Sequence, residues 1–248
     1  MKKNWLLLVI LFSLFFISSP IGISQVNATV LDDFNRPNGS IGGNWTVQSG
    51  SFNIVSNAVQ GGPSALATYN SLSSNVLEAD VTSTGTSIQY EALVLAYANL
   101  DNNIFIKVQT QGGGTTFTNA ACYQGNNGST STFGLGFFNL TAAFTTAHMR
   151  AAYDPGTSSV TITFSNIDGG SGTQQYVCTG APSTGGSGVG IGAYNIASGT
   201  LDNFAADVVA PNTVTSVPTL TEWGMIVFIF FAGLGSVYYL RRQRRVKS

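Results

Sequence analysis

Apolar and polar residues alternate over short stretches of this chain, and this period of two residues constrains its fold more than any other feature. One stretch reads V-T-I-T-F at residues 160–164, and another reads I-F-I-K-V at residues 104–108. Successive side chains of a strand point to opposite faces of a sheet, so each stretch predicts a half-buried β-strand. No amphipathic helical pattern interrupts such stretches between residues 29 and 210, which predicts an all-β sandwich or jelly roll.

Turn-forming residues divide the predicted strands into hairpins. The segment at residues 99–103 is rich in Asn and should turn the chain between strands at residues 92–98 and 104–110. The sequence D-P-G at residues 154–156 should form a second turn, just before the strand at residues 160–164.

The N-terminal end has the pattern of a secretory signal peptide. Lys2 and Lys3 precede an apolar segment at residues 5–17, and the small-residue sequence V-N-A follows at residues 26–28. We therefore expect residues 1–28 to be removed and the mature chain to begin at Thr29. The alternative is a retained N-terminal anchor, for which this apolar segment is short.

The C-terminal end has the pattern of a single membrane-spanning helix. Residues 225–240 are uncharged and apolar, and at about 1.5 Å per residue they reach roughly 24 Å, a little short of a typical hydrocarbon core of about 30 Å. Trp223 on one side and Tyr238 and Tyr239 on the other can extend the helix into the interfaces, so it can just span. Moving each Arg or Lys through the bilayer centre costs about 2.5 to 3.5 kcal/mol, so the basic tail should stop transfer and stay cytoplasmic. Besides Lys247, the tail contains four arginines, Arg241, Arg242, Arg244 and Arg245.

A short polar motif precedes this helix. It reads V-P-T-L-T-E-W-G, with the motif residues Val217, Pro218, Thr219, Leu220, Glu222, Trp223 and Gly224. Motif, helix and arginine cluster together resemble the IPTL-CTERM sorting domain of Gram-negative envelope proteins, with Val217 where the family usually has Ile. The resemblance covers residues 217–248. A permanent single-pass anchor uses the same residues and is the alternative.

The resemblance to a sorting domain implies a specific partner and destination. The partner would be an exosortase-type membrane transpeptidase that cleaves near the motif. The chain would first be an inner-membrane-anchored precursor and would then be transferred to the cell surface or extracellular matrix. These residues would be the substrate of another enzyme, and no catalysis by this chain follows from them.

The segment between the two ends is expected to form one exported domain, at residues 29–210, with a short linker at residues 211–216 before the sorting motif. The domain contains ten Asp and Glu residues but only three basic ones, Arg36, Lys107 and Arg150. Nucleic acid binding depends on Lys and Arg that neutralise phosphates, so this acidic balance argues against a nucleic acid partner.

Three segments of this domain resemble a known family. L-D-D-F-N-R-P-N-G-S-I-G-G-N-W-T-V-Q-S-G-S-F at residues 31–52, G-V-G-I-G-A-Y at residues 188–194 and L-D-N-F at residues 201–204 resemble the laminin-G-like and concanavalin A-like jelly rolls. The resemblance implies that the first and last strands lie side by side. The family includes lectins, carbohydrate-binding modules, glycosidases and adhesive domains, so fold alone does not choose the function.

Three functions follow as hypotheses. We expect a non-enzymatic module that binds glycans or has a structural role in the envelope, with extracellular polysaccharide as a possible partner. The alternatives are a glycoside hydrolase or lyase of this fold and a purely structural matrix or adhesion protein.

An enzymatic function has a sequence test. Related laminarinase-type hydrolases have E-x-D-x-x-E or E-x-D-x-E on one strand, because a retaining mechanism needs two carboxyl groups roughly 5 Å apart. Glu78 and Asp80 begin that pattern, but Thr82 and Ser83 stand where the second Glu is required. We therefore assign no catalytic residue and expect Glu78 and Asp80 to form a polar stripe facing solvent. His148, the single histidine, is expected to be an exposed strand residue.

Candidate cofactor sites are not diagnostic. Gly188, Gly190 and Gly192 lack the following helix of a dinucleotide site and instead predict a strand that another backbone approaches closely. Structural calcium is possible in this family, but the candidate acids have no diagnostic spacing, and we assign no metal or cofactor. These acids are Asp32, Asp33, Asp101, Asp168 and Asp202.

The cysteines and tyrosines complete the sequence predictions. Cys122 and Cys178 are the only cysteines, and export favours a disulfide between them over two free thiols. If the domain binds sugar, Tyr69, Tyr123 and Tyr194 are candidate platforms for pyranose faces. A fourth candidate, Trp45, begins the W-T-V strand and is expected in the core.

Overall fold

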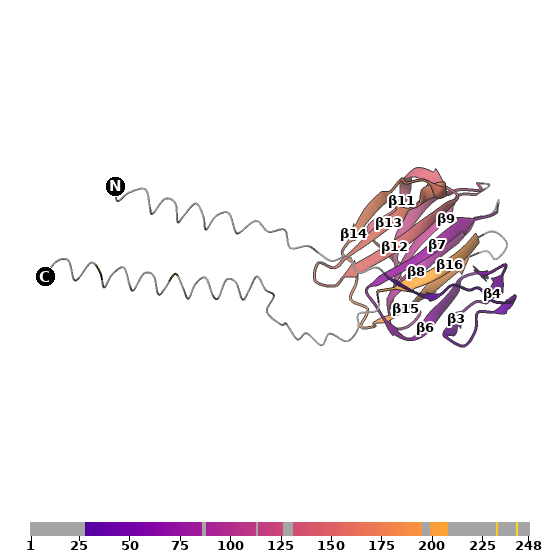
Figure 1. The fold of residues 1–248 in the computed structure, drawn as a ribbon, viewed down its shortest axis with the longest axis horizontal. Helices are drawn as coiled ribbons and strands as arrows, with labels where there is room; N and C mark the ends of the chain where they lie inside the picture. Colours follow the sequence, from indigo (N-terminus) through magenta and orange to yellow (C-terminus); the bar gives the residue numbers. More distant parts are fainter. Residues whose placement is uncertain are drawn as a thin grey trace. The chain divides into compact units, whose positions relative to one another are not determined.

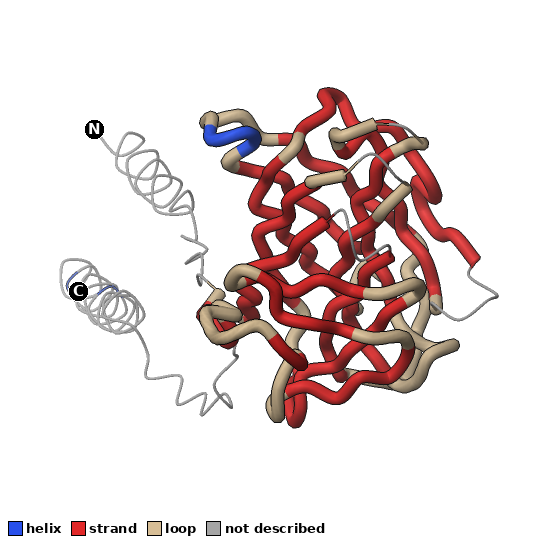
Figure 2. Tube along the Cα trace, turned by 90° about the vertical axis from the view of Figure 1, so that its right-hand side faces the viewer, coloured by secondary structure: helices blue, strands red, loops and turns tan. Residues whose placement is uncertain are grey.

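The structure is a computed structural model, and it describes residues 28–85, 88–112, 114–125, 131–194 and 199–207, together with the isolated residues 232 and 242. The chain divides into two compact units, Met1–Val208 and Val209–Ser248, and the described strands all lie in the first. In the described part of this unit the regular structure is almost all strand (Figure 2), apart from the helical turn η1 at Ile167–Gly169.

Nine strands form the first sheet, sheet A, in the order β14-β13-β12-β7-β16-β5-β4-β2, with β1 paired to β16. All of its pairings are antiparallel. Its strands are β1 (Thr29–Asp32), β2 (Gly39–Ser40), β4 (Phe52–Val55), β5 (Ala58–Gly61), β7 (Val76–Ser83), β12 (Thr146–Asp154), β13 (Ser159–Ser165), β14 (Gln174–Thr179) and β16 (Gly199–Ala206).

Seven strands form the second sheet, sheet B, in the order β11-β10-β9-β8-β15-β6-β3 (Figure 1). Its pairings are also antiparallel. Its strands are β3 (Trp45–Ser49), β6 (Ala65–Ser73), β8 (Tyr90–Tyr97), β9 (Ile104–Thr110), β10 (Phe117–Gln124), β11 (Ser131–Phe144) and β15 (Gly188–Tyr194). The predicted all-β sandwich of two antiparallel sheets is confirmed.

The main core lies between the two sheets and takes side chains from both. Its largest fully buried members include Phe34, Phe117, Phe144, Phe164 and Phe204. In β13 the expected alternation is confirmed, because Val160, Ile162 and Phe164 are buried while the residues between them are partly exposed. Both predicted hairpins also form, between β8 and β9 and between β12 and β13.

The prediction of a half-buried strand is wrong for β9. Ile104, Ile106 and Val108 face the main core as expected, but Phe105 on the opposite face is only 2% exposed. A second apolar cluster covers this outer face of sheet B, where Phe105 packs edge-on against the ring of Tyr90 at 5.6 Å. Sheet B is therefore apolar on both faces in its middle, which the alternation along one strand does not reveal.

The first and last strands lie side by side, as the family resemblance implied. β1 pairs with β16, and Asp32 is opposite Phe204. The Asp32 carboxylate accepts hydrogen bonds from Arg36 Nη1 and Nη2 at 2.7 and 3.0 Å and from Trp45 Nε1 at 2.7 Å. The backbone N–H of Phe34 donates a fourth bond at 2.9 Å. The spacing of the L-D-D-F-N-R…W segment thus has a physical cause, since two of its side chains and one backbone N–H meet at the carboxylate of Asp32.

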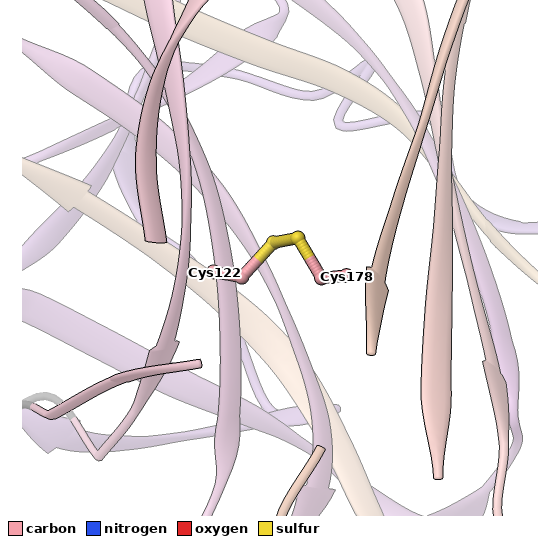
Figure 3. Close-up of a disulfide and its surroundings, with 2 residues drawn as sticks. All are labelled: Cys122 and Cys178. Carbon is pink, nitrogen blue, oxygen red and sulfur yellow. A yellow bond between two sulfur atoms is a disulfide. The ribbon is translucent and has the colours of Figure 1, made fainter. Parts of the chain in front are cut away.

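The predicted disulfide between Cys122 and Cys178 is confirmed. It joins β10 of sheet B to β14 of sheet A (Figure 3), with the two Cα atoms 6.6 Å apart. Both cysteines are fully buried in the main core. The bond therefore connects the two sheets through the interior of the sandwich.

The glycines of β15 allow close approach, as predicted. A Cβ atom added to Gly190 would collide with the carbonyl oxygen of Ala67 on β6, and one added to Gly192 would collide with the ring of Phe105. Glycine at these two positions lets β15 lie between β6 and β8 while the Phe105 ring covers it.

Several predictions lie outside the described residues. These are the signal peptide up to residue 27, the linker, the sorting motif Val217–Gly224 and, apart from Ala232 and Arg242, the apolar run and the basic tail. Within the part of the chain that is described, no helix combines the length and the apolar character needed to cross a bilayer.

Candidate functional site

The outer face of sheet B presents a group of aromatic side chains around one lysine. We call this group the tyrosine face and define it by Tyr90 on β8, Phe105 and Lys107 on β9, Tyr123 on β10, and Tyr194 on β15. The strand register brings these residues together, because Tyr90 is opposite Tyr194 and Phe105 is opposite Tyr123. The rings of Tyr90 and Tyr194 stack with centroids 5.6 Å apart, and Tyr194 is 38% exposed.

Lys107 lies in the middle of the tyrosine face. Its Nζ atom is 4.8 Å from the ring centroid of Tyr90 and 4.8 Å from that of Tyr123, so two cation–π contacts hold it. Its neighbours in register on the adjacent strands are Ala92 and Ala121. Both neighbours are alanines with short side chains, so the rings of Tyr90 and Tyr123 can pack beside the ammonium group.

Burial changes the proton affinity of this lysine. Removal from water lowers the pKa of Lys107 to about 8, since the charged form is the one that loses hydration. Burial also raises the pKa of Tyr90, which therefore stays neutral at physiological pH. At pH 7 the tyrosine face thus presents one ammonium group among aromatic rings.

Amide side chains continue this face toward the edge of the sheet. Gln109 is opposite both Tyr90 and Asn119, and Asn119 is in turn opposite Asn139 on β11. Asn119 donates through Nδ2 to Asn139 Oδ1 at 2.6 Å. Asn119 is fully buried, so Gln109 is the partly exposed amide of this pair. Rings can pack on apolar pyranose faces, and an exposed amide can bond to a sugar hydroxyl group.

The three tyrosines predicted as ligand contacts do not all lie on this face. Tyr123 and Tyr194 belong to it, whereas Tyr69 packs edge-on against Trp45 at 5.1 Å and stacks on Phe204 at 6.0 Å. Trp45 is 6% exposed and lies in the core, as predicted. The role of the tyrosines in binding stays a prediction.

The outer face of sheet A has a second, ionic cluster. His148 Nδ1 lies 2.8 Å from Asp80 Oδ1, and its Nε2 lies 3.3 Å from Glu78 Oε2. Arg150 donates to Glu78 Oε1 at 3.0 Å, and Asn203 donates to Asp80 Oδ2 at 2.7 Å. The prediction of an exposed histidine is wrong, because His148 has 28% of its side chain exposed and both ring nitrogens face carboxylates.

The charges of this cluster stabilise one another. The hydrogen bond with Asp80 raises the pKa of His148, and the same bond lowers the pKa of Asp80. A carboxylate can only accept, so the imidazolium form, with two donors, fits the two acidic partners best. The stripe of Glu78 and Asp80 is therefore polar as predicted, but its acids are neutralised by basic partners from β12.

Both carboxyl groups of this cluster bind basic side chains, which is not the arrangement of the acid and nucleophile of a retaining glycosidase. Both Glu78 and Asp80 contact the same histidine, and the position two residues further on is Thr82. A general acid needs a carboxyl group that is protonated before reaction, whereas these two form ion pairs. The cluster is thus explained by its own internal bonds.

Four of the five candidate calcium ligands, Asp32, Asp33, Asp168 and Asp202, accept hydrogen bonds from other groups in the described structure. Asp168 Oδ1 accepts from the backbone N–H groups of Thr145 and Thr146, and Asp33 Oδ1 accepts from that of Asn35. Among the described residues, no three or more His, Cys, Asp or Glu side chains form a group that could hold a metal ion. Calcium therefore remains unassigned.

Sequence reasoning missed Tyr90 and Lys107 as members of the site. The period of two places Phe105, Lys107 and Gln109 on one face of β9, and that signal was present in the sequence. What it did not contain was the register that puts Tyr90 and Tyr123 on either side of Lys107.

Comparisons with known proteins give structural likenesses only. No protein-family model and no curated protein matches the chain. The CBM2 module of the Lactobacillus casei BL23 phage J-1 evolved Dit is similar over 70% of this chain and 91% of its own, with 12% identity and a TM-score of 0.46. The carbohydrate-binding module CBM66 from Bacillus subtilis covers 68% of this chain and 100% of its own, with 14% identity and a TM-score of 0.45.

Lectin II from Ulex europaeus is a third such structure, with 11% identity, a TM-score of 0.44 and coverage of 67% of this chain and 93% of its own. All three TM-scores are below 0.5, so these likenesses carry no argument about ligand or activity.

Proposed function

We propose that this chain is an exported, non-enzymatic β-sandwich module of the cell envelope whose tyrosine face binds a glycan. The observation that carries the proposal is the grouping of Tyr90, Tyr123 and Tyr194 on one outer face of sheet B. The pairing of the first and last strands supports a jelly roll of the concanavalin A-like and laminin-G-like kind.

The dimensions of this face suit an extended sugar chain. Tyr194 and Tyr123 come from β15 and β10, which are separated by β8 and β9 in sheet B. With strands about 4.8 Å apart, the two tyrosines are roughly 14 Å apart across the sheet. Such a span accommodates more than one pyranose ring, and an extended site favours a polysaccharide over a monosaccharide.

Export and sorting form the second part of the proposal. The N-terminal signal peptide pattern and the C-terminal motif, apolar run and basic tail support a precursor held in the inner membrane. In this proposal an exosortase-type transpeptidase then transfers the domain at residues 29–210 to the cell surface or extracellular matrix. A surface position would bring the tyrosine face into contact with extracellular polysaccharide.

Glycan binding is tested with the intact chain purified in detergent and applied to a glycan array. We expect retention of at least one polysaccharide, and we expect Tyr194→Ala and Tyr123→Ala each to weaken it roughly ten-fold, which corresponds to about 1.4 kcal/mol of lost contact. Val177→Ala is the matched control, because Val177 is a 46% exposed apolar residue on sheet A. A wild-type chain that retains no glycan contradicts the binding function and leaves a structural module.

Sorting is tested in cells by replacing Pro218 and Trp223 together with alanine. We expect the uncut precursor to accumulate in the inner membrane, because the motif would no longer be extended and recognisable ahead of the helix. Asn212→Ala in the linker is the control and should be processed normally. Mass spectrometry of the mature protein reads the result, and an intact C-terminus in the wild type would contradict the sorting proposal.

A further inference from the structure

The tyrosine face contains a positive charge that the rest of the described sandwich leaves without an acidic partner. Residues 28–207 include three basic residues. Arg36 pairs with Asp32 at 2.7 Å, and Arg150 pairs with Glu78 at 3.0 Å. Lys107 contacts the rings of Tyr90 and Tyr123, and none of the described carboxylates forms a salt bridge with it.

The described strands of sheet B place no acidic side chain on the outer face beside Lys107. Glu91 is the one acidic residue in the strands of sheet B, and it alternates with Leu93 and Leu95, which face the main core. Its side chain is only 2% exposed and lies on the core side of the sheet, and burial raises the pKa of Glu91 well above its usual range. The outer face of sheet B therefore has a cation without a compensating anion, although the domain as a whole is acidic.

An anionic group on a ligand would stabilise this ammonium group more than a neutral sugar hydroxyl would. The two rings partly exclude water from Lys107. This loss of hydration destabilises the charged form of the amine and lowers its pKa. A carboxylate or sulfate bound beside Nζ would restore the lost counter-charge through a charge-assisted hydrogen bond. A neutral sugar hydroxyl would satisfy a donor without balancing the charge.

We infer that the glycan bound by the tyrosine face is acidic, with an anionic group of one sugar paired to Lys107 Nζ and sugar rings stacked on Tyr123 and Tyr194. This inference rests on the proposed glycan-binding function and specifies its ligand class. Lys is a point charge without the planar fork of Arg, so it selects for negative charge and accepts either a uronate carboxylate or a sulfate ester.

The test uses two matched pairs of immobilised polymers and the intact chain in detergent. Polygalacturonate and its fully methyl-esterified form share one backbone and differ in the carboxylate charge, and dextran sulfate and dextran differ in the sulfate charge. We expect the wild type to prefer the charged member of at least one pair by about ten-fold or more, the ratio that corresponds to one charge-assisted hydrogen bond. The preferred pair identifies the anion. Added salt should reduce the ratio.

Variants separate the role of Lys107 from the net charge of the protein. Lys107→Met keeps the length of the side chain and should bring the ratio between charged and neutral polymer close to one. Lys107→Arg should preserve the ratio, and so should Arg150→Gln, which removes the same unit of charge from the outer face of sheet A. The melting temperature of each variant establishes that the fold persists.

Each result decides a specific point. Equal retention of charged and neutral polymers would overturn the acidic ligand and leave glycan binding in place. A preference that survives Lys107→Met would overturn the assignment to this lysine. Retention of no polymer by the wild type, here and on the array, would overturn the proposed function together with this inference.

Discussion

Replacing Cys122 and Cys178 together with alanine is expected to lower the free energy of unfolding by about 4 kcal/mol. The disulfide closes a loop with a sequence separation of 56 residues, and removing it gives the unfolded chain more conformational freedom. The position of the bond adds to this effect, because it joins β10 to β14 and so connects the two sheets through the core. The double substitution avoids leaving a single buried thiol.

Chemical denaturation of the intact chain in detergent, followed by circular dichroism, measures this loss. The wild type unfolded in the presence of a reductant should show the same loss, since both changes remove the same crosslink. Ala121→Gly on the same strand is a control for a substitution in β10 that leaves the crosslink intact. A double variant as stable as the wild type would show that the sheets hold together without the bond.

Replacing Asp32 by alanine is expected to cost about 3 kcal/mol of stability. The substitution removes the acceptor of four hydrogen bonds and leaves the Trp45 N–H and the Arg36 guanidinium without their partner. Trp45 is buried, so its unpaired N–H loses its hydration without a replacement bond. The guanidinium is 34% exposed and recovers part of its hydration, which keeps the loss below that of a fully buried pair.

The pH dependence of stability gives a second measurement for Asp32. Burial alone would raise the pKa of Asp32, but the hydrogen bonds from Arg36, Trp45 and Phe34 outweigh it and lower the pKa below its ordinary value of 3.8. A lowered folded pKa means that this stability is present above pH 3.8 and is lost as pH falls through the folded value. The wild type should therefore lose its advantage over Asp32→Ala on acidification.

The neighbouring residue supplies the control for Asp32. Asp33 is exposed and accepts one local bond from the backbone of Asn35, so Asp33→Ala should change stability by less than about 1 kcal/mol. Equal effects of the two substitutions would show that the segment tolerates loss of the Asp32 contacts.

Much of the fold could be predicted from local sequence. The strand β13 and both hairpins follow from alternation and turn residues, which act over a few neighbouring residues. The disulfide followed from cysteine count and export, because two cysteines allow one intramolecular pairing. The β15 glycines predicted close backbone approach, since a side chain at those positions would require space that a packed sheet does not have.

The candidate site could be predicted only in part. Tyr123 and Tyr194 were selected as aromatic residues. Nothing along the chain indicates that Tyr69 packs against Trp45, that Tyr123 contacts Lys107 or that Tyr194 stacks on Tyr90. His148 was expected to be exposed because its strand alternates. Its two acidic partners lie on β7, 68 and 70 residues earlier in the chain, so the cluster depends on a long-range pairing.

The sequence by itself determined the strand β13, the turns of two hairpins and the crosslink between Cys122 and Cys178, because each depends on residues close in sequence or on a simple count. The export and sorting segments stay predictions. Only the tertiary structure decided the order and register of the sixteen described strands in their two sheets. That register places Lys107 between two tyrosine rings and buries Phe105 on what would otherwise be a solvent face. The physical reason is that β-pairing joins residues distant in sequence, and a shift of one residue would exchange every inward side chain for an outward one.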